Sequence, residues 1–278
     1  MTHDFPSNLE SLNLVRHGHV LHIELNRPQR LNALSRSTLL ELNAALDFAE
    51  ADIDVRAIVI SGAGKAFSSG FDLKEQLERA PQGSEIWREI LDLDFTTTMR
   101  FWHSPKPTIA AVHGPCLAGA FELALACDVT IASDDATFGE PELRFGAGIV
   151  TMLLPWVTGP KQAKEIILAG LDKIDAASAL RLGLVNRVTP VGQHLTQALK
   201  LAQTLAVIDP HLVKETKRAI NRSYEVRGLT IALDAALDID HGIESHGSPD
   251  KREFMRIARS EGLKAALAWR DKRFATES

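Results

Sequence analysis

The segment between residues 107 and 132 most constrains what this chain can fold into. Its first part, residues 107–112, is apolar and uncharged, which predicts a strand buried on both faces. A turn at Gly114 and an almost wholly apolar helix over residues 117–126 follow, and a second strand is predicted over residues 129–132. A strand, a helix and another strand in succession are typical of a layered α/β protein.

Similar patterns extend this interpretation along the chain. The further predicted elements are a hairpin over 12–25, a helix over 37–50, a strand over 56–61, a helix over 175–183 capped by Asp175, and a strand over 184–188. From Val191 onward the apolar spacing is helical. We therefore predict a core domain over residues 1–190 and a helical C-terminal region over residues 191–278.

Charge and cysteine content exclude several classes of protein. The 278 residues include 31 Lys and Arg against 36 Asp and Glu, a net charge of −5, so we predict no nucleic-acid partner. The only cysteines, Cys116 and Cys127, exclude a secreted disulfide framework, and we expect both to be buried.

The chain also lacks the sequence features of a membrane protein. Its longest uncharged stretch, residues 145–160, is shorter than the roughly 20 apolar residues of a membrane-spanning helix. The N-terminus carries Asp4 and Glu10 and has no arginine before Arg16, which resembles neither a signal peptide nor a transit peptide. We expect a cytoplasmic protein with no membrane partner.

Three histidines cluster around the first hairpin. His17, His19 and His22 fit strand and turn positions that face water better than a metal site, so we predict no bound metal.

Glycines and a buried acid mark two stretches where chemistry could occur. Residues 62–73 follow a predicted strand, and their glycines let backbone N–H groups approach a ligand, although a mobile surface loop would have the same composition. Glu122 is the single charge in the apolar helix, and burial would raise its pKa toward that of a general acid or base. A carboxylate satisfied by a partner is the alternative for Glu122.

The third stretch, residues 136–143, places Glu140 and Glu142 on either side of Pro141. A surface turn would explain these two acids equally well. Glu122 and Glu142 are twenty residues apart on different elements, so their spacing alone does not show that they meet.

Four segments together carry a family resemblance. They are NRPQRLNAL (26–34), AFSSGFDL (66–73), GPCLAGAFELALACD (114–128) and FGEPE (138–142). In this order and spacing they make the chain, from about residue 14 to residue 274, resemble the crotonase superfamily of enoyl-CoA hydratases and isomerases. The resemblance implies an α/β (α+β layered) fold, a crotonase-like spiral of ββα units with a helical C-terminal trimerisation region, assembled as a homotrimer or hexamer.

The resemblance also implies the site. The thioester carbonyl of an acyl-CoA would lie between the backbone N–H groups of Phe71 and Gly119, an oxyanion hole that stabilises an enolate. Coenzyme A enters as part of the substrate, and no separate cofactor is expected. The residues implied along the coenzyme A moiety are Arg30, Leu31, Ala33, Gly70, Phe71, Asp72, Leu73 and Lys74. The candidates to contact its phosphates are Arg27, Arg30, Lys65 and Lys74.

The family's two catalytic glutamates match Glu122 and Glu142. Hydration of a 2-enoyl-CoA to a 3-hydroxyacyl-CoA needs both, and we expect Glu142 to protonate C2 while Glu122 holds and activates the water. One departure concerns residues 143–155, which are shorter than the proline-glycine loop of hydratases. This change leaves open an isomerase or a carbon-carbon hydrolase, in which one glutamate moves the proton. A non-catalytic acyl-CoA-binding or RNA-binding module is the alternative from another class.

Overall fold

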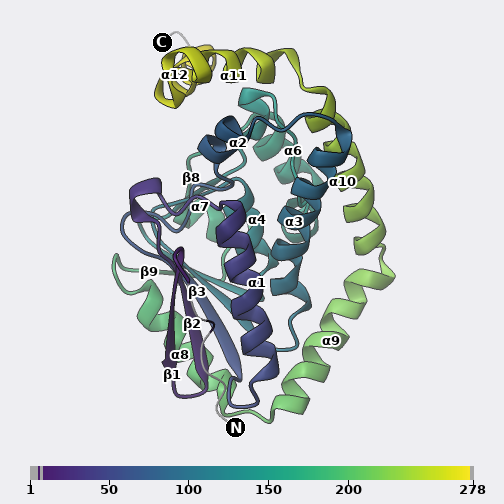
Figure 1. Ribbon diagram of the computed structural model, residues 1–278. Helices are drawn as coiled ribbons and strands as arrows, with labels where there is room; N and C mark the ends of the chain where they lie inside the picture. The colour runs from purple at the N-terminus through teal and green to yellow at the C-terminus, as the bar shows by residue number, and fades with distance from the viewer. Residues whose placement is uncertain (1–5, 7–8, 276–278) are drawn as a thin grey trace.

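The structure is a computed structural model that describes residue 6 and residues 9–275. Within this range a six-stranded sheet forms the centre of the molecule (Figure 1). In spatial order its strands are β1 (Leu12–His17), β2 (Val20–Leu25), β3 (Ala57–Gly62), β4 (Thr108–Val112), β6 (Val129–Ser133) and β9 (Arg187–Thr189). The first two strands form the predicted antiparallel hairpin, and each later pair of neighbours is parallel. The predicted layered α/β class is confirmed.

Helices cover both faces of this sheet. Ile58 and Ile60 of β3 belong to the core that also holds buried residues of α1 (Arg36–Ala51), α3 (Ser84–His103) and α4 (Gly119–Ala126). The alternating residues Ala57 and Val59 pack on the other face against α8 (His194–Ala206), which Figure 1 shows on the side of the sheet away from α1. Burial on both faces explains why the sequence of β3 is apolar without alternation.

A second, three-stranded sheet lies where the chain leaves the main sheet. Its strands are β5 (Pro115–Leu117), β7 (Thr137–Gly139) and β8 (Ile174–Asp175), and β7 pairs with both others. Strands this short show no detectable sequence period, so they were not predicted, and residues 117–118 precede α4 instead of starting it. Asp175 caps the next helix as predicted, because the Ser178 N–H donates to its Oδ1 over 2.6 Å.

The remaining helices surround these sheets. The short ones are η1 (Pro28–Arg30), α2 (Leu73–Arg79), η2 (Glu142–Phe145), α5 (Leu154–Val157), α6 (Pro160–Leu168) and α7 (Ala176–Arg181). The C-terminal ones are α9 (Pro210–Val226), α10 (Leu229–His246), α11 (Pro249–Glu261) and α12 (Leu263–Phe274). Figure 1 shows α11 and α12 at the end of the molecule that carries α2, and α11 packs against α2 and η2.

In the region predicted to be helical, the described residues form the helices α8 to α12, joined by short connections. Its first helix, α8, nevertheless packs on the central sheet, whereas α10 packs on α3. A domain boundary at residue 190 therefore stays a prediction. None of the helices in the described range combines the length and apolar character needed to cross a bilayer. Asp4, which entered the expectation about the N-terminus, lies outside the described residues.

Two side-chain expectations have different outcomes. Cys116 and Cys127 are buried as predicted, and burial raises the pKa of both thiols. The expectation that the hairpin histidines face water is wrong for His22, which is buried with its Nε2 2.8 Å from Ser61 Oγ. Across the described chain, no three His, Cys, Asp or Glu side chains are grouped so as to hold a metal ion.

Candidate active site

A cavity of about 460 Å³ lies between the core and the C-terminal helices. The loop before α1, the start of α2, α3, the segment after β7, α10 and α12 all contribute to its wall. The predicted site residues that line it are Arg30, Leu31, Ala33, Phe71, Asp72, Leu73, Lys74 and Glu142. The other three, Gly70, Gly119 and Glu122, lie behind this wall. Gly70 precedes the lining residue Phe71, Gly119 follows the lining residue Ala118, and Glu122 is one helical turn from Ala118.

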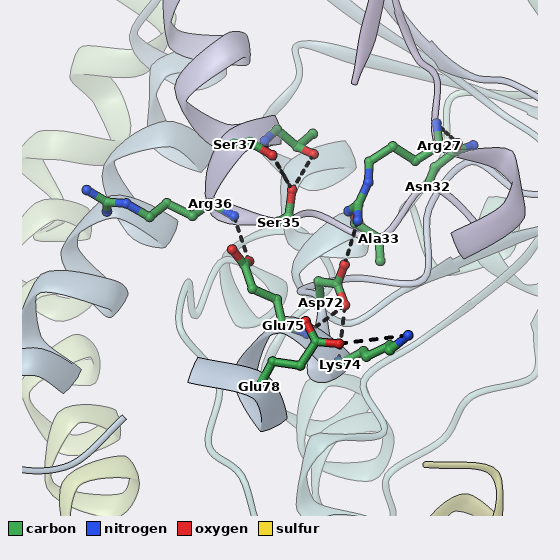
Figure 2. Close-up of polar contacts among 11 residues, drawn as sticks. Arg27, Asn32, Ala33, Ser35, Arg36, Ser37, Asp72, Lys74, Glu75 and Glu78 are labelled. Atoms are coloured by element: carbon green, nitrogen blue, oxygen red, sulfur yellow. Dashed lines mark hydrogen bonds and ion pairs between the residues drawn. The ribbon is translucent and has the colours of Figure 1, made fainter. Parts of the chain in front are cut away.

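Ion pairs and hydrogen bonds connect two of these segments on the side predicted for coenzyme A (Figure 2). Arg27 Nη2 lies 2.9 Å from the Asp72 carboxylate, and Arg27 Nη1 donates to the Ala33 carbonyl over 2.6 Å. Asp72 Oδ1 accepts from the N–H groups of Lys74 and Glu75, each over 3.1 Å, and so caps α2. The charges of Arg27 and Asp72 therefore hold the fold together.

The other candidate phosphate contacts are less engaged. Lys74 is 3.8 Å from the exposed Glu78, a weak pair (Figure 2). In the part of the chain that the structure describes, the side chains of Arg30 and Lys65 form no ion pair or hydrogen bond. Arg30, Lys65 and Lys74 can thus turn toward a phosphate, whereas Arg27 would first have to leave Asp72.

The fold brings the predicted oxyanion-hole segments into contact. Gly70 has a φ of +88°, and a side chain there would overlap Ala118, while the Phe71 ring fills the space that a side chain on Gly119 would need. The N–H groups of Gly70 and Asp72 donate to Ser68 Oγ and the Leu34 carbonyl, respectively. Between them, the Phe71 N–H has no acceptor among the described residues, and neither has the Gly119 N–H at the start of α4.

A strained residue, Ala118, connects β5 to α4 at this point. Ala118 has φ 56° and ψ −138°, a conformation that costs a non-glycine residue on the order of 1–3 kcal/mol. The Ala118 N–H donates to the Gly139 carbonyl over 2.8 Å, and the Ala118 carbonyl accepts from the Glu122 backbone N–H over 3.1 Å. Such strain persists only where surrounding contacts enforce it, and it is typical of functional sites.

Glu122 is buried and only half satisfied. Its Oε1 accepts from the Thr151 N–H over 2.9 Å, whereas Oε2 has no partner among the described residues. Burial raises the pKa of Glu122 well above its usual range, the nearby charge of Glu142 raises it further, and the Thr151 N–H opposes both. Thus Glu122 and Glu142 lie close enough to influence each other, which their spacing in the sequence could not show.

Glu140 and Glu142 are also buried, so the alternative of a surface turn is wrong. Burial raises the pKa of Glu142 to about 8, although a hydrogen bond with Glu140 opposes the rise. Burial and the charges of Glu142 and Glu122 raise the pKa of Glu140 well above its usual range. Oε2 of both Glu140 and Glu142 lacks a hydrogen-bond partner within the described range. The raised pKa values favour the protonated forms of both acids.

The alternative of a mobile surface loop at residues 62–73 is wrong as well, because half of this stretch, including Ala66, Phe67 and Ser68, is buried. The segment after Glu142, where the sequence departs from hydratases, is also held in place. Ser248 Oγ donates to the Gly146 carbonyl over 2.9 Å, and the Gly148 N–H donates to Glu244 Oε1 over 3.2 Å. Helices α10 and α11 thus fix this segment of the cavity wall.

Sequence analysis missed two acids of the cavity, Asp94 and Asp240. Both are buried, Asp94 in helix α3, to which no element was assigned, and Asp240 in α10. The signal was present in the sequence, because each acid continues an apolar helical stripe, three residues after Leu91 and Leu237 respectively.

Comparisons with known proteins agree with this architecture. The family model described as enoyl-CoA hydratase/isomerase matches residues 16–259. A putative enoyl-CoA hydratase of Thermus thermophilus is 42% identical over 214 residues, which cover 74% of this chain and 82% of the relative. A short-chain-enoyl-CoA hydratase of Clostridium acetobutylicum is 33% identical over 276 residues, 92% of this chain and 98% of the relative.

A solved structure has the same fold over nearly the whole chain. The crystal structure of an enoyl-CoA hydratase/isomerase from Xanthobacter autotrophicus Py2 superposes with a TM-score of 0.96 at 58% identity, covering 97% of this chain and 100% of that one. The crotonase-like fold predicted from the sequence is thereby confirmed. With a family model that spans most of its length and relatives at this level of identity, the chain belongs to the enoyl-CoA hydratase/isomerase family.

Proposed function

We propose that this protein is an enoyl-CoA hydratase that adds water across the double bond of a 2-enoyl-CoA to give a 3-hydroxyacyl-CoA. The observation that carries the proposal is the pair Glu122 and Glu142, two buried carboxyl groups beside one cavity, of which the charge of Glu142 raises the pKa of Glu122. Each has an oxygen with no partner in the described chain. Hydration needs two such groups, one to take a proton from water and one to give a proton to carbon.

The backbone of Phe71 and Gly119 would stabilise the intermediate. Both N–H groups lack acceptors among the described residues and lie in segments that touch. A thioester oxygen placed between them would gain two donors as negative charge develops on it, and one such donor is worth roughly 10²- to 10³-fold in rate. Gly119 also begins α4, so the helix dipole favours the same charge.

The proposed syn addition starts with Glu142 protonated and Glu122 ionised, the form of Glu122 that the hydrogen bond from the Thr151 N–H favours. Glu122 accepts a proton from water as the water oxygen bonds to C3, and Glu142 releases its proton to C2. The proton on Glu122 then returns to Glu142 before the next turnover, so the two glutamates end in the form in which they began. The raised pKa of Glu142, about 8, keeps it protonated at neutral pH, as a donor requires. Coenzyme A would enter as part of the substrate, without a separate cofactor, and contact Arg30, Lys65 or Lys74.

Isomerisation, the other reaction named for the family, has one observation in its favour. Glu142 lines the cavity, whereas Glu122 lies behind the wall. A single glutamate facing the acyl chain suits the transfer of one proton between two carbons, with Glu122 as a bystander.

Turnover of crotonyl-CoA tests the proposal. We expect loss of the conjugated thioester and a product heavier by one water, and we expect Glu142→Gln to reduce the rate by 10²- to 10⁴-fold while acyl-CoA binding is retained. An unchanged rate in Glu142→Gln contradicts the assignment. Conversion of a 3-enoyl-CoA without uptake of water would favour the isomerase.

We also propose that the chain assembles as a trimer or hexamer through its C-terminal helices. Supporting this, α9 and α10 expose large apolar side chains on their outer faces, whereas Leu233 and Leu237 of α10 are buried within the chain. The exposed residues are Leu212, Ile220, Val226, Ile231, Ile239 and Ile243. Surfaces of this kind are typical of interfaces between subunits.

A further inference from the structure

Asp94 of α3 and Asp240 of α10 are acids of the cavity wall that the proposed hydration does not use. Each lies one helical turn beyond a leucine of the apolar cluster formed by Leu91, Val150 and Leu237. Helices α3 and α10 pack against each other, and Leu91 and Val150 line the cavity too. The wall therefore combines an apolar patch with two carboxyl groups from neighbouring helices.

Asp240 is a buried acid without a hydrogen-bond partner. The residue is 2% exposed, and neither carboxyl oxygen has a hydrogen-bond partner among the described residues. Burying a carboxylate without a partner is costly, so native proteins rarely keep one that has no use. A buried, unpartnered carboxylate on a cavity wall points to a ligand that supplies the missing hydrogen bonds.

The donors near Asp240 are engaged elsewhere. Lys251 forms a buried ion pair with Glu244 and lies 4.3 Å from the centre of the Trp87 ring. The Gly148 N–H donates to Glu244 as well. A side chain on Gly148 would overlap Asp240 Oδ1, so this glycine makes room for the carboxylate without bonding to it. The fold thus accommodates Asp240 in the cavity wall and leaves it unpaired.

The two acids differ in protonation. Burial and the charge of Asp240 raise the pKa of Asp94 well above its usual range, which favours the protonated form of Asp94. Burial raises the pKa of Asp240 to about 6, while Lys251 and His241 oppose the rise, so Asp240 is mostly ionised. One acid can then donate a hydrogen bond and the other can accept one. A hydroxyl group, which both donates and accepts, matches this pair.

We propose that Asp94 and Asp240 bind a hydroxyl group on the acyl chain, so that the substrates of this enzyme are hydroxylated 2-enoyl-CoA thioesters. This inference rests on the proposed hydration for the identity of the substrate. An unsubstituted hydrocarbon chain would leave Asp240 buried and unpaired in the complex, and sites with unpaired polar groups discriminate strongly against such ligands.

The test compares matched substrates that differ by one hydroxyl. The pairs are but-2-enoyl-CoA with 4-hydroxybut-2-enoyl-CoA, and hex-2-enoyl-CoA with 6-hydroxyhex-2-enoyl-CoA. We expect kcat/KM to favour the hydroxylated member of at least one pair on the order of 10-fold or more. Asp240→Leu should abolish this preference and raise kcat/KM for the plain substrate, and the smaller change Asp240→Asn should weaken it.

Asp234→Leu is the matched control, because it replaces an aspartate by leucine at an exposed position of the same helix, α10. We expect it to keep the wild-type preference. Equal kcat/KM within both pairs, or a preference that survives in both Asp240 variants, would overturn the inference and leave the hydration proposal intact.

Binding of saturated analogues separates the two proposals. If the protein hydrates none of these substrates, calorimetry with hexanoyl-CoA and 6-hydroxyhexanoyl-CoA still measures the hydroxyl site. Tighter binding of the hydroxylated analogue, lost in Asp240→Leu, would support the site while the proposed hydration fails. Equal dissociation constants for the two analogues would overturn the site as well.

Discussion

Acids at the start of α2 and the acids Glu122, Glu142 and Asp240 have opposite surroundings. At the start of α2, Asp72 pairs with Arg27 and caps the helix, and Glu75 accepts from the Arg36 N–H over 2.8 Å (Figure 2). By contrast, oxygens of Glu122, Glu142 and Asp240 have no partner in the described chain. The first group stabilises the fold, whereas the second group costs stability that its chemistry must justify.

The comparison teaches that residue type alone does not separate structural from catalytic acids. Asp72 and Glu142 both line the cavity and both begin a helical segment. Asp72 meets an arginine and two backbone N–H groups, but Glu142 meets Glu140, another acid. The number and sign of the partners decide which acid holds the fold and which can exchange a proton.

The largest expected effect is on turnover, from Glu122→Gln. The amide keeps the acceptor for the Thr151 N–H but cannot take a proton from water, so kcat with crotonyl-CoA should fall by about 10²- to 10⁴-fold. The midpoint of thermal unfolding should stay the same or rise, because a buried ionisable group has been removed. A variant that loses activity together with stability would break the comparison.

The next effect is on stability, from Asp72→Ala. This change removes the cap of α2 and leaves Arg27 without its carboxylate, and we expect a loss of about 1–3 kcal/mol in the free energy of unfolding. Denaturant titration measures it. The control is Glu78→Ala, since this exposed pair with Lys74 should change stability by less than about 0.5 kcal/mol. Equal effects of both substitutions would show that Asp72 does not hold the start of α2 in place.

The third effect concerns pH. As a proton donor with a pKa of about 8, Glu142 loses its proton as the pH rises, so turnover should fall about tenfold per pH unit above pH 8. The native state holds this proton where the unfolded chain, with an ordinary value of 4.5, has released it. Its contribution to stability is therefore complete below about pH 4.5 and is lost as the pH rises through about 8.

Thermal unfolding of the wild type and of Glu142→Gln across this pH range checks the sign. The wild type should lose stability relative to the variant as the pH rises from about 4.5 to 8. A difference that is constant with pH would mean that Glu142 has an ordinary pKa and does not belong with the unpaired acids Glu122 and Asp240.

Much of the fold was predictable from local patterns. The hairpin of β1 and β2, the strands β3, β4 and β6, and the capped helix α7 follow from apolar runs, periodicity and turn residues. The three-residue strands β5 and β7 were missed because a strand needs more residues to show its period. The prediction that His22 faces water was wrong, because its partner Ser61 comes from a neighbouring strand, which the local pattern around His22 does not show.

The sequence by itself determined the family, the order of the core elements and the candidates Glu122 and Glu142, because these depend on residue types at fixed spacing along one chain. Only the tertiary structure decided which acids are paired and which are not. Asp72 finds Arg27, and Asp240 finds no donor, through contacts between helices and loops that are distant in sequence. Burial and charge are properties of that packing, so the protonation of a side chain is set only once the chain has folded.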